Sequence, residues 1–154
     1  MKSDLEMGGQ LLLFSLSGFR CAVPLKFVAR IIPAVAILPL PGAPEIVEGA
    51  INFSGKIVPV VNLRKRLFLE EKRAELSDRI VMAHAGERLI GICADSVEGV
   101  EECGTITASE SIFPGLELVS GVAKIDGKLA IIQDMEKCFM PGEEEALDAA
   151  MEGA

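Results

Sequence analysis

The chain contains no tryptophan, no tyrosine and only one histidine among its 154 residues. Its net charge is −8, and few aromatics on an acidic body argue against a nucleic-acid surface, which needs basic patches and stacking rings. The single histidine, His84, lies in the apolar-flanked run from Val81 to Ala85, where a core or sheet-face role is favoured over a general base. The motifs of the nucleophile elbow, the zinc-protease helix and the Walker phosphate loop are absent. The sequence therefore favours a protein that is not an enzyme.

Cysteine is sparse and scattered. Cys21, Cys93, Cys103 and Cys138 form no C-x-x-C pair, so neither a zinc site nor a redox motif is indicated. We expect free thiols in a reducing compartment. The acidic residues Asp95, Glu98, Glu101 and Glu102 cluster in sequence, but charges on a solvent-facing bend usually face water. No metal and no cofactor is predicted.

Long hydrophobic runs are also missing. No window reaches the roughly 18 uninterrupted apolar residues of a membrane span, and the run from Ile31 to Leu40 contains two prolines. Residues 1–10 carry charges and glycines and lack the apolar core of a signal peptide. We therefore expect a cytoplasmic protein without direct membrane insertion.

The most informative stretch that is present runs from Gly49 to Arg64. Two apolar runs flank Ser54-Gly55, and a small pair with glycine between β-rich runs predicts a hairpin. The second run is rich in valine and isoleucine, which suit a strand. Pro59 cannot donate a hydrogen bond, so it predicts an edge strand or a bulge.

A similar stretch recurs downstream, which predicts a duplication. When Gly121 is laid on Gly49, Gly127 falls on Gly55, and Leu129, Asp134 and Met135 fall on Ile57, Asn62 and Leu63. A weaker similarity relates residues 21–31 to residues 90–100. Both offsets are close to 70 residues, near the lower size at which a β unit can hold its own core. We predict two similar β subdomains that share an apolar seam.

The rest of the chain gives local predictions. Leu25, Val28, Ile31 and Ile32 recur at helical spacing after Pro24. Residues 33–44 contain four prolines and predict a stiff connection. Residues 79–94 predict a further hairpin with Ala85-Gly86 at its tip. The acidic tail after Pro141 is predicted as either a loosely docked helix or a disordered segment, and the residues leave both open.

The order of these motifs resembles the CheW-like family, which includes the coupling protein of bacterial chemotaxis and the regulatory domain of the histidine kinase CheA. The residues that match its central pattern of Gly, Asn, Arg-Gly and Pro-Val-x-Asp-Leu-Arg are Gly49, Asn52, Gly55, Pro59, Val60, Leu63 and Arg64. Residues 91–97 resemble a second family segment, and the likeness covers residues 10–140.

The resemblance implies a mainly β fold of two five-stranded, SH3-like barrels related by a pseudo-twofold axis, with short helices. We place one subdomain at about residues 19–79 and the other at residues 10–18 plus 80–140, followed by the acidic tail at 141–154. It also implies a non-catalytic adaptor whose partners are a chemoreceptor signalling tip and the regulatory domain of a CheA-type kinase. The residues predicted to contact partners are Val28, Arg30, Ile32, Val35, Ile37, Gly49, Asn52, Ser54, Gly55, Asn62 and Arg64.

Three departures from the family pattern concern charge. Ser54 stands where the pattern has arginine, Arg30 stands where many members have glutamate, and Asn62 replaces the usual aspartate. We therefore predict a divergent coupling protein with altered docking, in which Arg30 and Arg64 act as rim charges. The alternative is a small-molecule-binding regulatory barrel, for which Asn52, Asn62 and His84 are the polar candidates.

Overall fold

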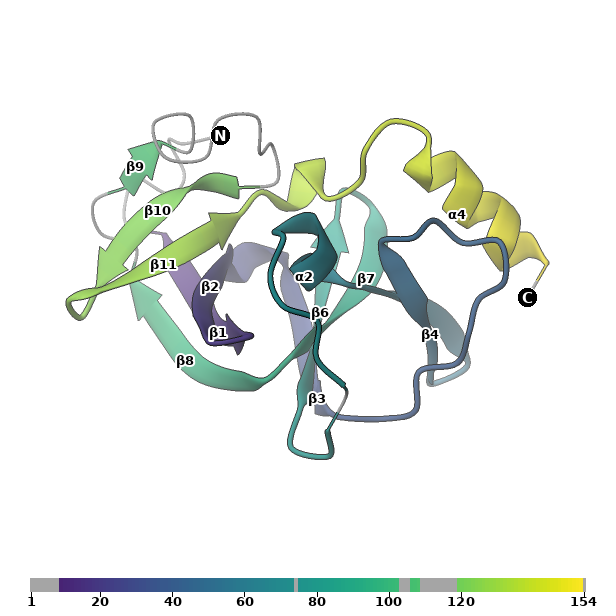
Figure 1. Ribbon diagram of the computed structural model, residues 1–154, viewed down its shortest axis with the longest axis horizontal. Coiled ribbons are helices and arrows are strands. Elements are labelled where there is room, and N and C mark those ends of the chain that lie inside the picture. The colour runs from purple at the N-terminus through teal and green to yellow at the C-terminus, as the bar shows by residue number, and fades with distance from the viewer. Residues whose placement is uncertain (1–8, 74, 103–105, 109–118, 154) are drawn as a thin grey trace.

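The computed structural model describes residues 9–73, 75–102, 106–108 and 119–153, and β-strands dominate them (Figure 1). Within these residues, one sheet has the strand order β8-β1-β2-β11-β10-β9 and the other has the order β3-β6-β7-β5-β4. The first sheet is built from β8 (Ser96–Glu102), β1 (Gln10–Leu16), β2 (Phe19–Pro24), β11 (Lys128–Gln133), β10 (Val119–Ile125) and β9 (Ile106–Ala108). The second is built from β3 (Val28–Pro33), β6 (Arg79–Ala85), β7 (Arg88–Ala94), β5 (Lys56–Val61) and β4 (Val47–Phe53). The helical segments described are η1 (Leu25–Phe27), α2 (Leu63–Arg66), η2 (Met135–Lys137) and α4 (Glu143–Glu152).

The two sheets form two small barrels. We call residues 28–94 the first barrel and residues 10–24 plus 96–133 the second barrel. Each has its own apolar interior, represented by Ile51 and Met82 in the first and by Leu13 and Ile132 in the second. A third and larger cluster, which we call the central core, contains residues of both barrels. The predicted shared seam is thus present.

Alternation along the strands explains how two strands serve two cores. In β1, Leu11 and Leu13 enter the interior of the second barrel, whereas Leu12 and Phe14 enter the central core. In β6, Ile80 and Met82 face the interior of the first barrel, whereas Val81, Ala83 and Ala85 face the central core. Successive side chains of a strand point to opposite faces. These strands are therefore apolar on both faces.

The predicted duplication is confirmed by pairing and backbone geometry. The β4–β5 and β10–β11 hairpins have register shifts at Val47/Gly49 and Val119/Gly121, 72 residues apart. Their turns also match, since Ser54 and Asp126 both have φ of 52° and each is followed by a glycine with positive φ. Positive φ at both central residues is the geometry of a tight hairpin turn.

The subdomain boundaries differ from those predicted. Residues 19–24 pair with β1 and β11 in the second barrel, and residues 80–94 pair with β3 and β5 in the first. The reason is that each hairpin, β1–β2 and β6–β7, stays intact while the next strand crosses to the other sheet. In terms of the repeat, each barrel combines the first hairpin of one copy with the later strands of the other.

Two local predictions were wrong. The segment after Pro24 is a single 3-10 turn followed by β3, not a longer helix, because β-branched Val28, Ile31 and Ile32 pair with β6. Pro59 lies in β5 between β4 and β7 rather than at an edge. Its missing N–H is tolerated because β7 pairs only with Val60 and Val61.

The acidic tail forms a docked helix, which resolves the alternative left open above. Leu147 of α4 is fully buried and belongs to the central core. Arg66 pairs with Glu143, the first residue of the helix, and Arg88 pairs with Asp148 near its middle, so the helix is tied to the first barrel at two points. Among the described residues, no helix is both long and apolar enough to span a bilayer.

The described cysteines are core residues with unreactive thiols. Burial raises the pKa of Cys21, Cys93 and Cys138 from 9.0 to about 12. We expect iodoacetamide to leave all three unmodified at pH 8 in a folded Cys103→Ser chain, and to modify all three in urea, as read by mass spectrometry. Modification of the folded chain at any of them would contradict this.

The same pKa shift makes stability depend on alkaline pH. The folded state favours the neutral thiol, so this contribution to the free energy of unfolding is present below pH 9 and is lost as the pH rises toward 12.

Candidate docking surface and the polar network between the barrels

The structure divides the predicted contact residues into an exposed, a half-buried and a buried group. The exposed residues are Arg30, Val35, Asn52, Ser54 and Gly55. Arg30 of β3 lies over the ring of Phe53 in β4, 5.4 Å from its centroid, and this contact joins the two edge strands of the first barrel's sheet. Asn52 holds the hairpin tip by accepting a hydrogen bond from the Gly55 N–H at 2.9 Å. Partner contact by these residues remains a prediction.

Three apolar residues of the predicted set are partly buried against the cores of the protein. Val28, Ile32 and Ile37 are half-buried: Val28 packs against the central core, and Ile32 and Ile37 pack against the interior of the first barrel. Val35 is the exception, with 47% of its surface exposed. Partner contact by these four residues stays a prediction.

Gly49 is buried because another segment of backbone crosses directly over it. Leu38 and Ala50 exchange hydrogen bonds of 2.9 and 2.8 Å, and a Cβ atom on Gly49 would lie 2.2 Å from the Leu38 carbonyl oxygen. Only glycine permits this approach. Its conformational role is to let residues 34–40 close the first barrel.

Asn62 caps α2. Its side-chain oxygen accepts a hydrogen bond from the Lys65 N–H at 3.2 Å, and its amide nitrogen donates to Glu71 at 3.1 Å. An N-cap needs a side-chain acceptor, which asparagine and aspartate both supply. The replacement of the family's aspartate thus keeps the cap.

Arg64 is a buried bridge between the barrels. Its guanidinium pairs with Asp95 at the end of β7, and its Nε donates to the Ser17 hydroxyl at 2.9 Å. The Ser17 N–H donates to the other oxygen of Asp95 at 2.8 Å. Only 7% of the Arg64 side chain is exposed. The prediction of a rim charge was therefore wrong, because this cation lies inside a closed network.

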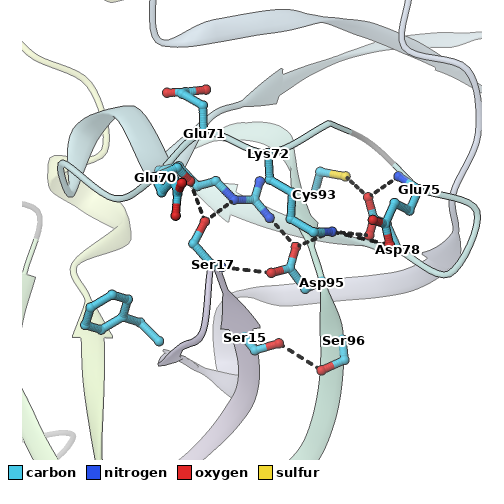
Figure 2. A network of polar contacts seen from close by, with 12 residues as sticks. Ser15, Ser17, Glu70, Glu71, Lys72, Glu75, Asp78, Cys93, Asp95 and Ser96 are labelled. Atoms are coloured by element: carbon cyan, nitrogen blue, oxygen red, sulfur yellow. Dashed lines mark hydrogen bonds and ion pairs between the residues drawn. The ribbon is translucent and has the colours of Figure 1, made fainter.

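The network continues along the loop that precedes β6. Lys72 lies 3.3 Å from Asp95 and 3.6 Å from Asp78, whose other oxygen accepts from the Glu75 N–H. Figure 2 shows Lys72 reaching toward Asp95 and Asp78, beside the Cys93 thiol. Asp95 is the carboxylate that pairs with Arg64. Asp95 is engaged by cations, and Glu98 pairs with Arg20 at 2.9 Å. Within the described residues, no cluster of potential metal ligands is formed.

Sequence reasoning missed the residues that complete the exposed surface. Leu38 and Ile57 are 61% and 44% exposed. Leu38 pairs with Ala50 and Ile57 pairs with Asn52, so both lie on the outer face of the first barrel, as cross-strand partners share a face. The internal repeat relates Ile57 to Leu129, and Leu129 is also exposed, at 65%. We call Val35, Leu38, Asn52 and Ile57 the docking face. Arg30 pairs with Met82 and lies over Phe53, so it belongs to the other face of the sheet.

Comparison with known proteins agrees with this fold. A family model described as the CheW-like domain matches residues 10–140. The chemotaxis protein CheW of Thermotoga maritima is 30% identical over 132 residues, covering 83% of this chain and 85% of that protein. The chemotaxis protein CheW of Treponema pallidum is 27% identical over 138 residues, covering 84% of this chain and 81% of that protein.

A solved structure extends the agreement to three dimensions. The crystal structure of the scaffolding protein TtCheW from Thermoanaerobacter tengcongensis superposes with a TM-score of 0.80 at 27% sequence identity, covering 89% of this chain and 96% of that one. The family match spans both barrels, whose main strands follow the same order in the two sheets. The chain therefore belongs to the CheW-like domain family.

Proposed function

We propose that this protein is a non-catalytic adaptor that couples chemoreceptors to a CheA-type histidine kinase. The observation that carries the proposal is the match of residues 10–140 to the CheW-like domain, together with relatives named as chemotaxis and scaffolding proteins. An adaptor acts by presenting surfaces, and the fold supplies two barrels with exposed outer strands. We place its action in the cytoplasm. The alternative of a small-molecule regulatory barrel has no comparable support.

The docking face suits an apolar helical stripe of a partner. Val35, Leu38 and Ile57 supply exposed apolar area, and helix recognition commonly places such a stripe on a hydrophobic surface. Arg30, an exposed cation of the same barrel, would orient an acidic or polar helix more than it would add affinity. The partners we propose are the signalling tip of a receptor coiled coil and the regulatory domain of the kinase.

The departures in charge then bear on which partner binds. Arg30 and Ser54 are exposed, so neither is needed inside the fold, and both are free to differ between family members. We propose that they set partner choice. Titration of the full chain with the receptor tip fragment and the kinase regulatory domain of its own organism tests whether the protein is an adaptor. Absence of binding to both at concentrations near 100 µM, in the range of weak encounter complexes, would refute the proposal.

A single substitution on the docking face should separate binding from folding. We expect Val35→Asp to weaken binding to the receptor fragment by about tenfold or more, because a charge must be desolvated against an apolar partner. Its melting temperature should stay within a few degrees, since exposed substitutions change stability little. Isothermal titration calorimetry and thermal unfolding measure the two effects.

The matched control is Leu129→Asp, the same change of polarity at an exposed site on the other barrel. It should leave binding to the fragment that uses the docking face unchanged. Equal loss of affinity in both variants would show that the docking face is misassigned.

A further inference from the structure

The acidic helix α4 is held on the first barrel by a small contact. Leu147 is fully buried, Ala150 is 8% exposed, and both belong to the central core. A Cβ atom on Gly42 would lie 3.9 Å from the Cβ of Ala150, which places the helix against the segment between β3 and β4 (Figure 1). Leu147 is the fully buried side chain of this contact, and Met151 of the same helix also packs against the central core.

Two arginines of the barrel complete the contact. Arg66 donates to Glu143 at 2.6 Å, and Arg88 of β7 pairs with Asp148. These arginine side chains are only 15% and 20% exposed, and the Nε of each is buried without a hydrogen-bond partner among the described residues. We call Gly42, Arg66, Arg88 and the adjoining central core the helix socket. Its chemistry fits an acidic amphipathic helix.

The residues of α4 alone stabilise the helix only weakly. It has ten residues, its N-cap Gly142 makes no side-chain cap hydrogen bond, and its last turn carries no basic residue. Helices of this length are marginal without tertiary packing. Once its contacts with the helix socket break, α4 can move away through a change of backbone at residues 139–142, where Gly142 already has φ of 88°. Terminal elements open at a lower free-energy cost than core strands.

We propose that the helix socket accepts α4 from a second copy of this chain, so that two copies exchange their C-terminal helices. A second copy carries the acidic helix with the leucine and carboxylates that the socket already binds. Residues 139–142 reach about 14 Å when extended, so exchange requires two closely apposed copies. The tethered helix has an effective concentration in the mM range, and exchange becomes competitive when copies are crowded to similar levels.

A pair of full-length charge-reversed chains tests the exchange. In Arg88→Glu the socket repels its own helix, and in Asp148→Arg the helix is repelled by its own socket. When the two chains are mixed, each helix meets a complementary socket only on the other chain. We expect the mixture to form a heterodimer at a concentration at least tenfold lower than either chain alone, measured by size exclusion with light scattering from about 1 µM to about 1 mM, the range that brackets the tethered concentration.

Two controls fix the interpretation. The single chain with both Arg88→Glu and Asp148→Arg restores the pair in cis and should remain monomeric, which also shows that the reversed charges are compatible with folding. Leu147→Asp in both mixed chains should abolish the heterodimer. A mixture that remains monomeric while each chain shows native circular dichroism would overturn the proposal, and so would a dimer that survives Leu147→Asp.

Discussion

The Arg64→Ala chain should lose about 3 kcal/mol of unfolding free energy, the cost typical of removing one partner of a buried ion pair. The substitution leaves Asp95, which is 19% exposed, with Lys72 at 3.3 Å but without its guanidinium, and it also removes a hydrogen bond to Ser17. Because Arg64 lies on α2 of the first barrel and Ser17 on the β1–β2 turn of the second, the lost contacts join the barrels. Urea unfolding of both chains measures the difference.

The comparison that isolates burial is Glu98→Gln, which breaks the ion pair between Glu98 and Arg20. The Glu98 side chain is 38% exposed, so we expect a loss of about 0.5 kcal/mol, as for other surface pairs. The double variant Arg64→Met with Asp95→Asn should recover part of the stability, since no charge is then left unpaired. If Arg64→Ala folds as stably as the parent chain but fails to bind a receptor or kinase fragment, Arg64 is a contact residue after all.

Gly49→Ala is the second large effect that we expect, again about 3 kcal/mol or more, because the new methyl group meets backbone rather than a movable side chain. Its Cβ would lie 2.2 Å from the Leu38 carbonyl oxygen. The crossing segment must move away, and the two hydrogen bonds between Leu38 and Ala50 must break. Hydrogen exchange at these two amides should accelerate before global unfolding does.

Gly91→Ala provides the graded comparison. There the Cβ would lie 3.0 Å from the Cγ2 of Ile80, a side-chain atom in an apolar interior that can shift by a few tenths of an ångström. We expect a loss of about 1 kcal/mol, at the low end for overpacking. Equal stability of the Gly49→Ala and Gly91→Ala chains would show that segment 34–40 adapts without cost.

Local features of the fold were predictable because short-range chemistry determines them. Ser54-Gly55 and Asp126-Gly127 adopt the positive φ values that their residue types tolerate, and these pairs marked both hairpins. The repeat was visible because equivalent turns and bulges need similar residues. The pairing of the hairpins with later strands was not predictable. Strand β1 is apolar on both faces, because Leu11, Leu12, Leu13 and Phe14 are all apolar, so the sequence does not show which face belongs to which core.

The site was harder to predict because its charges are paired across long distances in sequence. Arg64 and Asp95 are 31 residues apart, and the residues next to Arg64 in the sequence do not indicate that its guanidinium is buried. The docking of α4 depends on Arg88, which is 60 residues from Asp148. The exposure of Leu38 depends on its pairing with Ala50 of β4, which the local sequence does not indicate. Periodicity reports which residues are apolar, but only tertiary packing decides which of them remain outside.

The distribution of the repeat between the barrels has a consequence for ancestry. Each barrel takes its β1–β2 or β6–β7 hairpin from one copy and its remaining main strands from the other. A progenitor carrying one copy, of about 70 residues, could complete this type of barrel only by lending its hairpin to a sister molecule, so it would exist as an intertwined homodimer. Joining two such genes end to end would preserve that dimer inside one polypeptide, and neither half could afterwards be excised as a working module.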